Sequence, residues 1–222
     1  MASLGRALFL LLWLLHADGL VTMMAAGRRG GKAGGTSGKG FGSKPPSLGD
    51  VIRATKTRAP ADAASTPCAC GSGAAYAACC QPYHDGEAVA TTAERLVRTR
   101  YTAFCYRLPA YIVSTTHPTN RDFNPNAVDA VRALDRRGMF DSFEFVGLEI
   151  GSVEEQSSEE RFVAFTVTLR ALESDGGIAK GSELRVSERS RFLPRSDVAG
   201  WLYASGEVRA QVEGLEDALL NG

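Results

Sequence analysis

The spacing of hydrophobic residues changes near the middle of the chain, and this change predicts the fold class. Between residues 91 and 138 the apolar positions recur every three or four residues, as an amphipathic helix requires. From residue 143 onward apolar and polar residues alternate, as they do in half-buried strands. Helices followed by strands predict an α+β fold with an antiparallel sheet, and not alternating βαβ units.

Three helices are expected in the first of these regions. The first begins with Thr91 or Thr92 as its cap, because a hydroxyl there satisfies a free backbone N–H. Its buried face is expected to hold Ala93, Leu96, Val97, Tyr101, Phe104 and Cys105. The second helix is expected over residues 109–116. The third begins at an Asn126 cap and ends at Gly138.

Four strands are expected in the second region. They correspond to the segments "FEFVGLEIGSV", "RFVAFTVTLRAL", "ELRVSERSRFL" and "GWLYASGEVRA". Charged or glycine-rich turns at residues 154–160, 175–177 and 195–197 separate them. Strict alternation in the first strand predicts that Phe143 and Phe145 share one face and that Leu148 occupies the other.

The first 66 residues have a different composition. Arg6 precedes the apolar run "ALFLLLWLL", which is shorter than the roughly 20 residues of a membrane-spanning helix. Residues 1–19 are therefore predicted to be a signal peptide, with no membrane span in the mature chain. Residues 20–66 are basic and rich in Gly and Ser, so they are predicted to be disordered and similar to a plastid transit peptide. This two-part presequence, like those of some algae, predicts delivery to the plastid stroma; secretion is the alternative.

The charge balance and the missing motifs exclude several function classes. Residues 67–222 carry 16 basic and 22 acidic residues, a net charge of −6, so nucleic acid is not expected as a partner. The chain has no G-x-x-x-x-G-K-[ST], no G-x-G-x-x-G after a strand and no H-E-x-x-H. Nucleotide hydrolysis, dinucleotide chemistry and zinc-protease activity are therefore not expected.

Four of the five cysteines lie within thirteen residues, in the stretch "TPCACGSGAAYAACCQPY". They are Cys68, Cys70, Cys79 and Cys80. A disulfide between the last two would strain the backbone, and crosswise pairing would place two bridges over one small loop. Four thiolates match the tetrahedral preference of zinc, and Gly71 and Gly73 permit the tight turn between the two pairs. One structural zinc ion is predicted; disulfides and a reactive dithiol are the alternatives.

A zinc ion held by four thiolates has no open position for water or substrate, so the cluster is not expected to be catalytic. Free thiols also favour a reducing compartment, which supports the plastid over the exterior. His84 follows the cluster and could replace one thiolate, but a surface residue that caps this segment is expected. Release of zinc on oxidation is a third hypothesis, although nothing in the sequence singles out a low-pKa thiol.

The segment "CACGSGAAYAACC" resembles the SEC-C motif, a zinc knuckle. Together with "AERLVRTRYTAFCYRLPAYIVSTTHP", "ERSRFL" and "GWLYASGEV", in that order, it resembles the YchJ family over about residues 67–209. The resemblance implies a knuckle at 67–86 and a nuclear-transport-factor-2-like domain at 88–210, a cone of three helices packed on a curved antiparallel sheet. Residues 211–222 form a tail without cysteine, whereas bacterial members often have a second knuckle there.

Cones of this fold enclose a pocket at their wide end. The polar or aromatic residues expected to line it are Arg98, Arg100, Tyr101, Tyr111, His117, Glu188, Ser190, Trp201 and Tyr203. Alternatively, Arg98 and Glu188 form a structural pair between helix and sheet, and Tyr101 and Trp201 fill the core.

The preferred functional hypothesis is a binding module and not an enzyme. The knuckle would dock a protein partner, as the resemblance to the SecA tail implies, or the cone would hold a small ligand. A homodimer across the sheet is a further alternative. The alternative is a cofactor-free isomerase or dehydratase with His117 as general base, oriented by Asp122. Tyr101 or Tyr111 would then act as the electrophile. Only analogy of fold supports this alternative.

Overall fold

The structure is a computed structural model that describes residues 45–136, 138–174 and 178–212. The predicted signal peptide, the first part of the predicted transit segment, the turn at 175–177 and residues 213–222 lie outside the described residues. The helices are α2 (Leu48–Ala54), η1 (Tyr76–Ala78), α3 (Gln81–His84), α4 (Ala93–Cys105), α5 (Pro109–Ser114), α6 (Ala127–Asp135) and α7 (Met139–Ser142). The strands are β1 (Phe143–Ser157), β2 (Glu160–Ala171), β3 (Glu183–Pro194) and β4 (Trp201–Val212).

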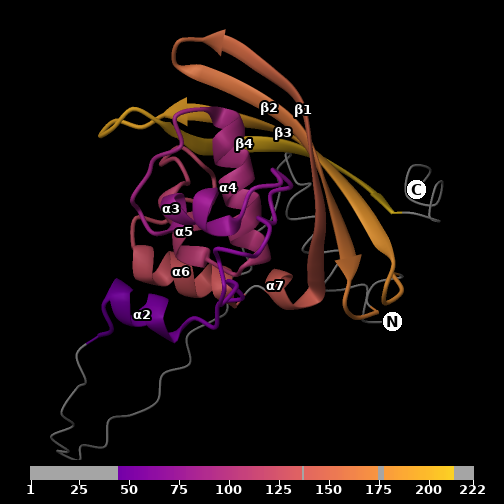
Figure 1. The fold of residues 1–222 in the computed structure, drawn as a ribbon. Coiled ribbons are helices and arrows are strands. Elements are labelled where there is room, and N and C mark those ends of the chain that lie inside the picture. Colours follow the sequence, from indigo (N-terminus) through magenta and orange to yellow (C-terminus); the bar gives the residue numbers. More distant parts are fainter. Residues whose placement is uncertain (1–44, 137, 175–177, 213–222) are drawn as a thin grey trace, which may run out of the picture.

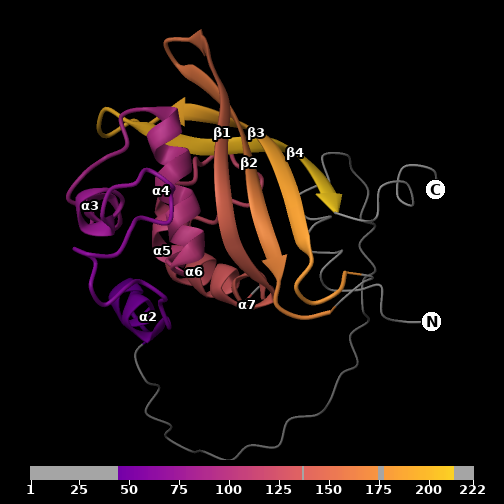
Figure 2. The ribbon, with the colours of Figure 1, turned by 45° about the vertical axis from the view of Figure 1, so that its right-hand side comes forward.

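The four strands form one antiparallel sheet in the order β1-β2-β3-β4. Figures 1 and 2 show that the helices gather on one face of this curved sheet and that the β1–β2 hairpin extends beyond them. Helix α4 contacts β1, β2 and β4, so it is the element that the sheet curves around. The α+β fold expected from the sequence is confirmed.

The expected helix caps are present. The Thr92 side chain accepts a hydrogen bond from the Arg95 N–H at the start of α4, and Asn126 accepts one from the Asp129 N–H at the start of α6. Gly138 follows α6 as expected, but it also begins the short helix α7, which the sequence did not predict. Its φ of 82° is left-handed, a conformation that glycine adopts without a steric penalty.

Strand β1 departs from the expected strict alternation. Its pairing with β2 shifts register between Phe145 and Gly147, and again between Ile150 and Val153. Phe145 pairs with Leu169 and Leu148 with Val167, so Phe145 and Leu148 face the same side. The prediction that they occupy opposite faces is wrong, because each bulge adds a residue that reverses the alternation. Both bulges also help the sheet to curve over α4.

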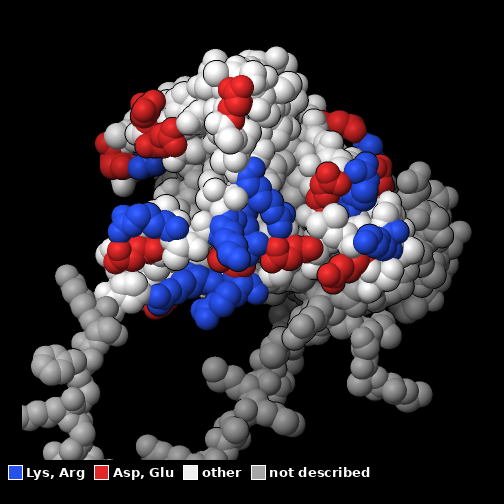
Figure 3. All heavy atoms as spheres, turned by 60° about the horizontal axis from the view of Figure 1, so that its bottom comes forward, with Lys and Arg blue, Asp and Glu red and all other residues white. Residues whose placement is uncertain are grey.

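Residues 48–66 belong to the folded body, which corrects the prediction that the whole of 20–66 is disordered. Ser47 and Asp50 form a capping box that starts α2, and α2 contacts α6. Beyond α2, Arg58 donates to the Phe140 carbonyl over 2.5 Å and pairs with Asp141 at 2.8 Å. Composition alone missed these contacts because they are made to residues more than 80 positions away. Figure 3 shows this underside, where basic and acidic side chains alternate.

The apolar core lies between the sheet and the helices in separate clusters. One joins Leu96 and Val97 of α4 to Val163 and Phe192 of the sheet. A second lies under α5 and α7, and a third at the end of the sheet where β1 begins. Among the described residues, none of the helices is long and apolar enough to cross a membrane.

Candidate functional site

The cysteine segment folds as a compact knuckle. The Cys68 N–H donates to the Ala74 carbonyl over 2.8 Å and so closes the turn. Gly71 and Gly73 inside that turn have φ values of 74° and 79°, as their positions in the sequence led us to expect. Helix η1 then delivers the adjacent pair Cys79 and Cys80, so one short loop brings both pairs of cysteines together.

The four sulfur atoms form a cluster that could hold a metal ion. All four Sγ atoms, of Cys68, Cys70, Cys79 and Cys80, lie within 4.8 Å of one another, and all four residues are buried. Each of the four is a free thiol, and the Cys70 and Cys79 sulfurs are 3.5 Å apart. Zn–S bonds near 2.3 Å at tetrahedral corners require S···S separations of about 3.8 Å. The spacing of the sulfurs therefore fits one tetrahedral ion.

Hydrogen-bond donors surround the sulfurs. Ser72 accepts from the Ala74 N–H, so its own hydroxyl proton is available to Cys79, whose sulfur is 3.2 Å away. Neighbouring side chains, Cys68 first and then Cys80, lower the pKa of the Cys70 thiol through hydrogen bonds. Hydrogen bonds with neighbouring cysteines raise the pKa of Cys68 and of Cys80, so the cluster without an ion favours one thiolate, at Cys70, and the other ligands must lose their protons when a metal binds.

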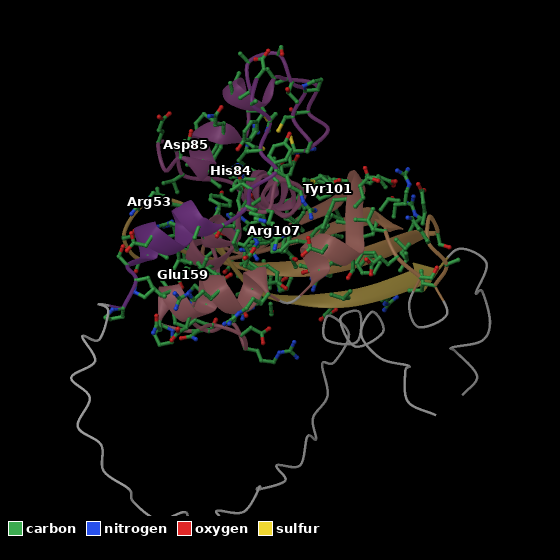
Figure 4. All side chains as sticks on the ribbon, turned by 90° about the horizontal axis from the view of Figure 1, so that it is seen from below. Arg53, His84, Asp85, Tyr101, Arg107 and Glu159 are labelled. Atoms are coloured by element: carbon green, nitrogen blue, oxygen red, sulfur yellow. The ribbon has the colours of Figure 1, made fainter. Side chains whose placement is uncertain are left out.

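His84 is not placed as a ligand. Its Nε2 lies 2.9 Å from the Thr99 carbonyl, which can only accept, so Nε2 carries the hydrogen. Its Nδ1 then accepts from the Tyr76 hydroxyl at 2.8 Å. Both ring nitrogens are thus occupied by groups other than sulfur, and Figure 4 shows the side chain between the knuckle and α4. The expectation that His84 is a surface cap is also wrong, because the ring is half-buried in this junction.

Four polar side chains connect the knuckle to the helices of the cone. Tyr76 contacts His84, and His84 packs edge-to-face on Tyr111 with ring centroids 4.6 Å apart. The Tyr111 hydroxyl donates to Thr99 Oγ1 over 2.8 Å. Burial raises the pKa of Tyr111 to about 12, so its hydroxyl keeps its proton at neutral pH. The predicted electrophile Tyr111 therefore lies at the junction between knuckle and cone.

Inside the cone, Arg100 of α4 meets the last strand. Its Nη1 donates to the Ile112 carbonyl and to Thr115 Oγ1, both at 2.8 Å. Its guanidinium lies over the Tyr203 ring, 4.7 Å from the centroid. Within the described part of the chain, all the hydrogen bonds of Arg100 leave from Nη1. The Nε and Nη2 atoms of its guanidinium group therefore remain available as hydrogen-bond donors.

Glu188 of β3 lies in the same interior. It accepts hydrogen bonds from Ser190, at 2.5 Å, and from the Tyr203 hydroxyl. Burial raises the pKa of Glu188, against the opposing effect of these hydrogen bonds and of Arg100. Four of the predicted pocket residues, Arg100, Glu188, Ser190 and Tyr203, are thus brought together.

Three other predicted pocket residues lie elsewhere. Arg98 pairs with Glu94 at 2.8 Å and donates to the Cys70 carbonyl, so the suggested pair with Glu188 does not form. Trp201 donates from Nε1 to the Thr91 carbonyl at the start of α4. Tyr101 packs edge-to-face on Phe145 in the core.

The predicted catalytic group is not assembled. His117 Nδ1 lies 2.8 Å from Thr119 Oγ1 and also accepts from the Thr119 N–H, which makes it part of a local turn. The Asp122 carboxylate faces Arg121 at 3.7 Å. No hydrogen bond joins Asp122 to His117 among the described residues, and Tyr101 and Tyr111 lie in the core and the junction. The structure thus separates the four candidates.

Sequence reasoning missed several residues of both sites. Thr102 and Arg95 of α4 contact sulfur atoms, although they come from outside the cysteine motif. Thr99 and Thr102 interrupt the apolar face of α4, and that irregularity was the available signal. Gly206 was missed as well, because its role depends on a side chain of the neighbouring strand.

Comparison with known proteins gives a consistent result. The model of the family described as "YchJ, middle NTF2-like domain" matches residues 92–206. A UPF0225 protein of Cupriavidus pinatubonensis is 35% identical over 157 residues, which cover 68% of this chain and 94% of the relative. A UPF0225 protein of Streptomyces coelicolor is 39% identical over 141 residues, 64% of this chain and 94% of the relative.

A solved structure also resembles the fold. It is the solution structure of a SEC-C motif containing protein from Rhodopseudomonas palustris, with a TM-score of 0.50 and 30% sequence identity. The match covers 64% of this chain and 98% of that protein. Both the knuckle motif and the cone therefore have counterparts in known proteins.

Proposed function

This chain belongs to the YchJ family, and from that premise we propose that it is a zinc-stabilised binding protein whose cone holds a small polar ligand. The buried cluster of four thiols supports zinc as the metal, because soft thiolates at tetrahedral spacing suit Zn²⁺ and leave no position open for substrate. Cys68, Cys70, Cys79 and Cys80 would hold the ion, whose role is to fix the fold of the knuckle.

The arrangement of Arg100 carries the second part of this proposal. Arg100 uses only Nη1 for its hydrogen bonds, and no buried side-chain N or O atom lacks a partner among the described residues, so its Nε and Nη2 keep contact with solvent and are open to a ligand. The guanidinium lies over the aromatic ring of Tyr203, and the Glu188 carboxyl group is near enough to act on it electrostatically. A small molecule with a carboxylate or carbonyl group would satisfy Nε and Nη2, and its apolar part would rest on the aromatic side chains.

Native mass spectrometry of the purified protein tests both parts. We expect one zinc ion per chain and, on gentle ionisation, an additional mass that the Tyr203→Phe variant retains less well. Cys80→Ala should lose the zinc, whereas Cys105→Ala, which alters the one cysteine outside the cluster, should keep it. Unoxidised protein without zinc would contradict the metal assignment. Zinc-loaded protein that never carries or binds a small carboxylate or carbonyl compound would contradict the ligand assignment alone.

The same spectra bear on the proposed partners. Docking of a protein through the knuckle would appear as a co-purified chain, and a homodimer as a doubled mass. The outer face of the sheet carries ion pairs, such as Arg185 with Glu149 and Arg189 with Glu154, where an apolar dimer interface would carry hydrophobic residues. The expectation of a dimer across the sheet therefore gains no support from this face.

Catalysis remains a prediction that no observation favours. If the protein is an isomerase or dehydratase, His117→Ala should abolish turnover while the protein stays folded. If the protein is a binding module, this variant should retain its ligand.

The location in a plastid is part of the proposal. The basic, Gly- and Ser-rich composition of residues 20–44 supports it, and so do four thiols that remain unpaired. A fluorescent protein fused behind residues 1–66 should accumulate in the plastid of an alga with a secretory route to that organelle. Accumulation in the medium would favour secretion.

A further inference from the structure

Two of the groups that contact the sulfur cluster come from the cone and not from the knuckle. Thr102 and Arg95 lie on α4, one on its buried face and one at its edge. The Thr102 hydroxyl is 3.4 Å from Cys80 Sγ and 3.8 Å from Cys68 Sγ. Arg95 Nη1 is 3.7 Å from Cys79 Sγ. Figure 4 shows the sulfur atoms on the side of the knuckle that faces this helix.

Thr102 has one hydroxyl proton, and its two nearest acceptors compete for it. Its Oγ1 lies 3.0 Å from the Arg98 carbonyl one turn earlier, which is the ordinary partner of a threonine in a helix. Cys80 is the second acceptor. A neutral thiol is a weak acceptor, but a thiolate is anionic and forms a stronger, charge-assisted hydrogen bond. Because Thr102 is fully buried, water cannot replace this donor.

We infer that α4 completes the metal centre, with Thr102 as a positioning residue that donates to Cys80 and contacts Cys68 when the four sulfurs bind the ion. This inference rests on the proposed binding of zinc by the cluster. Outer-shell hydrogen bonds of this kind orient the ligands and stabilise their charge, and their loss weakens metal binding about 10- to 100-fold. Metal binding and the docking of the knuckle on the cone are then one event.

Arg95 supplies a weaker, electrostatic contribution. Four thiolates around one divalent cation leave a net charge of −2 on the centre, and a guanidinium at 3.7 Å offsets part of it. The side chain is half-exposed, so solvent screens this attraction. We expect a two- to five-fold loss of affinity at Arg95→Met, which corresponds to about 0.5–1 kcal/mol for a screened charge pair.

The test measures metal affinity directly, by competition between the whole purified protein and a chromophoric zinc chelator. Thr102→Val should bind zinc about 10- to 100-fold more weakly, and Thr102→Ser should restore the affinity to within a few-fold. The matched control is Thr99→Val. Thr99 is equally buried on the same helix, but its hydroxyl bonds the Leu96 carbonyl and Tyr111. This control should lower stability and leave the affinity of the folded protein unchanged.

Cobalt substitution provides a second readout that a purely structural role would not change. The sulfur-to-metal charge-transfer band of the Co²⁺ protein should move to lower energy in Thr102→Val, because a thiolate without its donor holds its electrons less tightly. Thr99→Val should leave the band in place. If Thr102→Val does not fold, Arg95→Met tests the contribution of α4 at a half-exposed position. Zinc bound by every variant with wild-type affinity and an unshifted band would overturn the inference, although zinc binding itself would stand.

Discussion

The carboxyl group of Glu188 on β3 lies directly over the backbone of Gly206 on β4, in the space that a side chain at position 206 would occupy. The Tyr203 hydroxyl borders the same space. Gly206 is therefore required for close approach and not for an unusual backbone angle, since its φ is not left-handed. Because position 206 has no Cβ, the Glu188 side chain can extend to the Tyr203 hydroxyl and towards Arg100.

Gly206→Ala should displace the Glu188 carboxyl group. The added methyl overlaps an oxygen that is already hydrogen-bonded, so we expect a loss of about 1–3 kcal/mol in the free energy of unfolding, as for other overpacked positions. Urea denaturation measures this loss. Gly147→Ala is the matched control, because its nearest neighbour, Thr168, is at an ordinary distance of 3.6 Å. Equal effects of the two substitutions would contradict this role of Gly206.

The buried position of Glu188 should make stability depend on pH. Burial raises the pKa of Glu188 above its ordinary value of 4.5, so the folded state holds this proton more tightly than the unfolded state does. The contribution of Glu188 is then complete below about pH 4.5 and is lost as the pH rises through the pKa of the folded state. Compared with Glu188→Gln, the wild type should lose stability as the pH rises from 4 to 7. Urea titrations of both proteins at several pH values test this, because effects of other groups cancel. A difference in unfolding free energy between the two proteins that stays constant with pH would exclude this role of Glu188.

His84→Ala should leave the metal in place and weaken the junction. The imidazole joins the Tyr76 hydroxyl to the Thr99 carbonyl, and its removal leaves two enclosed polar groups without their partner. We expect the free energy of unfolding to fall by about 1–3 kcal/mol. Elemental analysis should still find the zinc content of the wild type. A loss of zinc comparable to that of Cys80→Ala would show that His84 serves as a ligand after all.

Arg58 should hold the segment before the knuckle against the cone. Arg58→Ala removes the contacts with Phe140 and Asp141, so residues 48–66 should detach more often. Limited proteolysis should then cleave this segment faster. Arg53→Ala is the control, because Arg53 pairs only with Asp50 of its own helix among the described residues. Unchanged cleavage of Arg58→Ala would indicate that α2 alone retains the segment.

Much of the architecture follows from local sequence. Thr92 and Asn126 cap their helices because their side chains satisfy nearby backbone N–H groups, which requires no distant partner. Gly71 and Gly73 define the knuckle turn for an equally local reason. The face that each residue of β1 presents could not be predicted, since the bulges depend on how the strand pairs with β2.

The sequence by itself determined the four cysteines as one cluster, because all of them lie on a single short loop whose glycines permit a tight turn. It also determined the order of helices and strands, through the period of the apolar residues. Only the tertiary structure decided that α4 contributes Thr102 and Arg95 to that cluster. It also decided that Arg100, and not Arg98, enters the cone. These outcomes depend on how α4 is rotated about its own axis between the knuckle and the sheet. Helical periodicity fixes the spacing of residues along α4, but it does not fix which neighbour each side of the helix contacts.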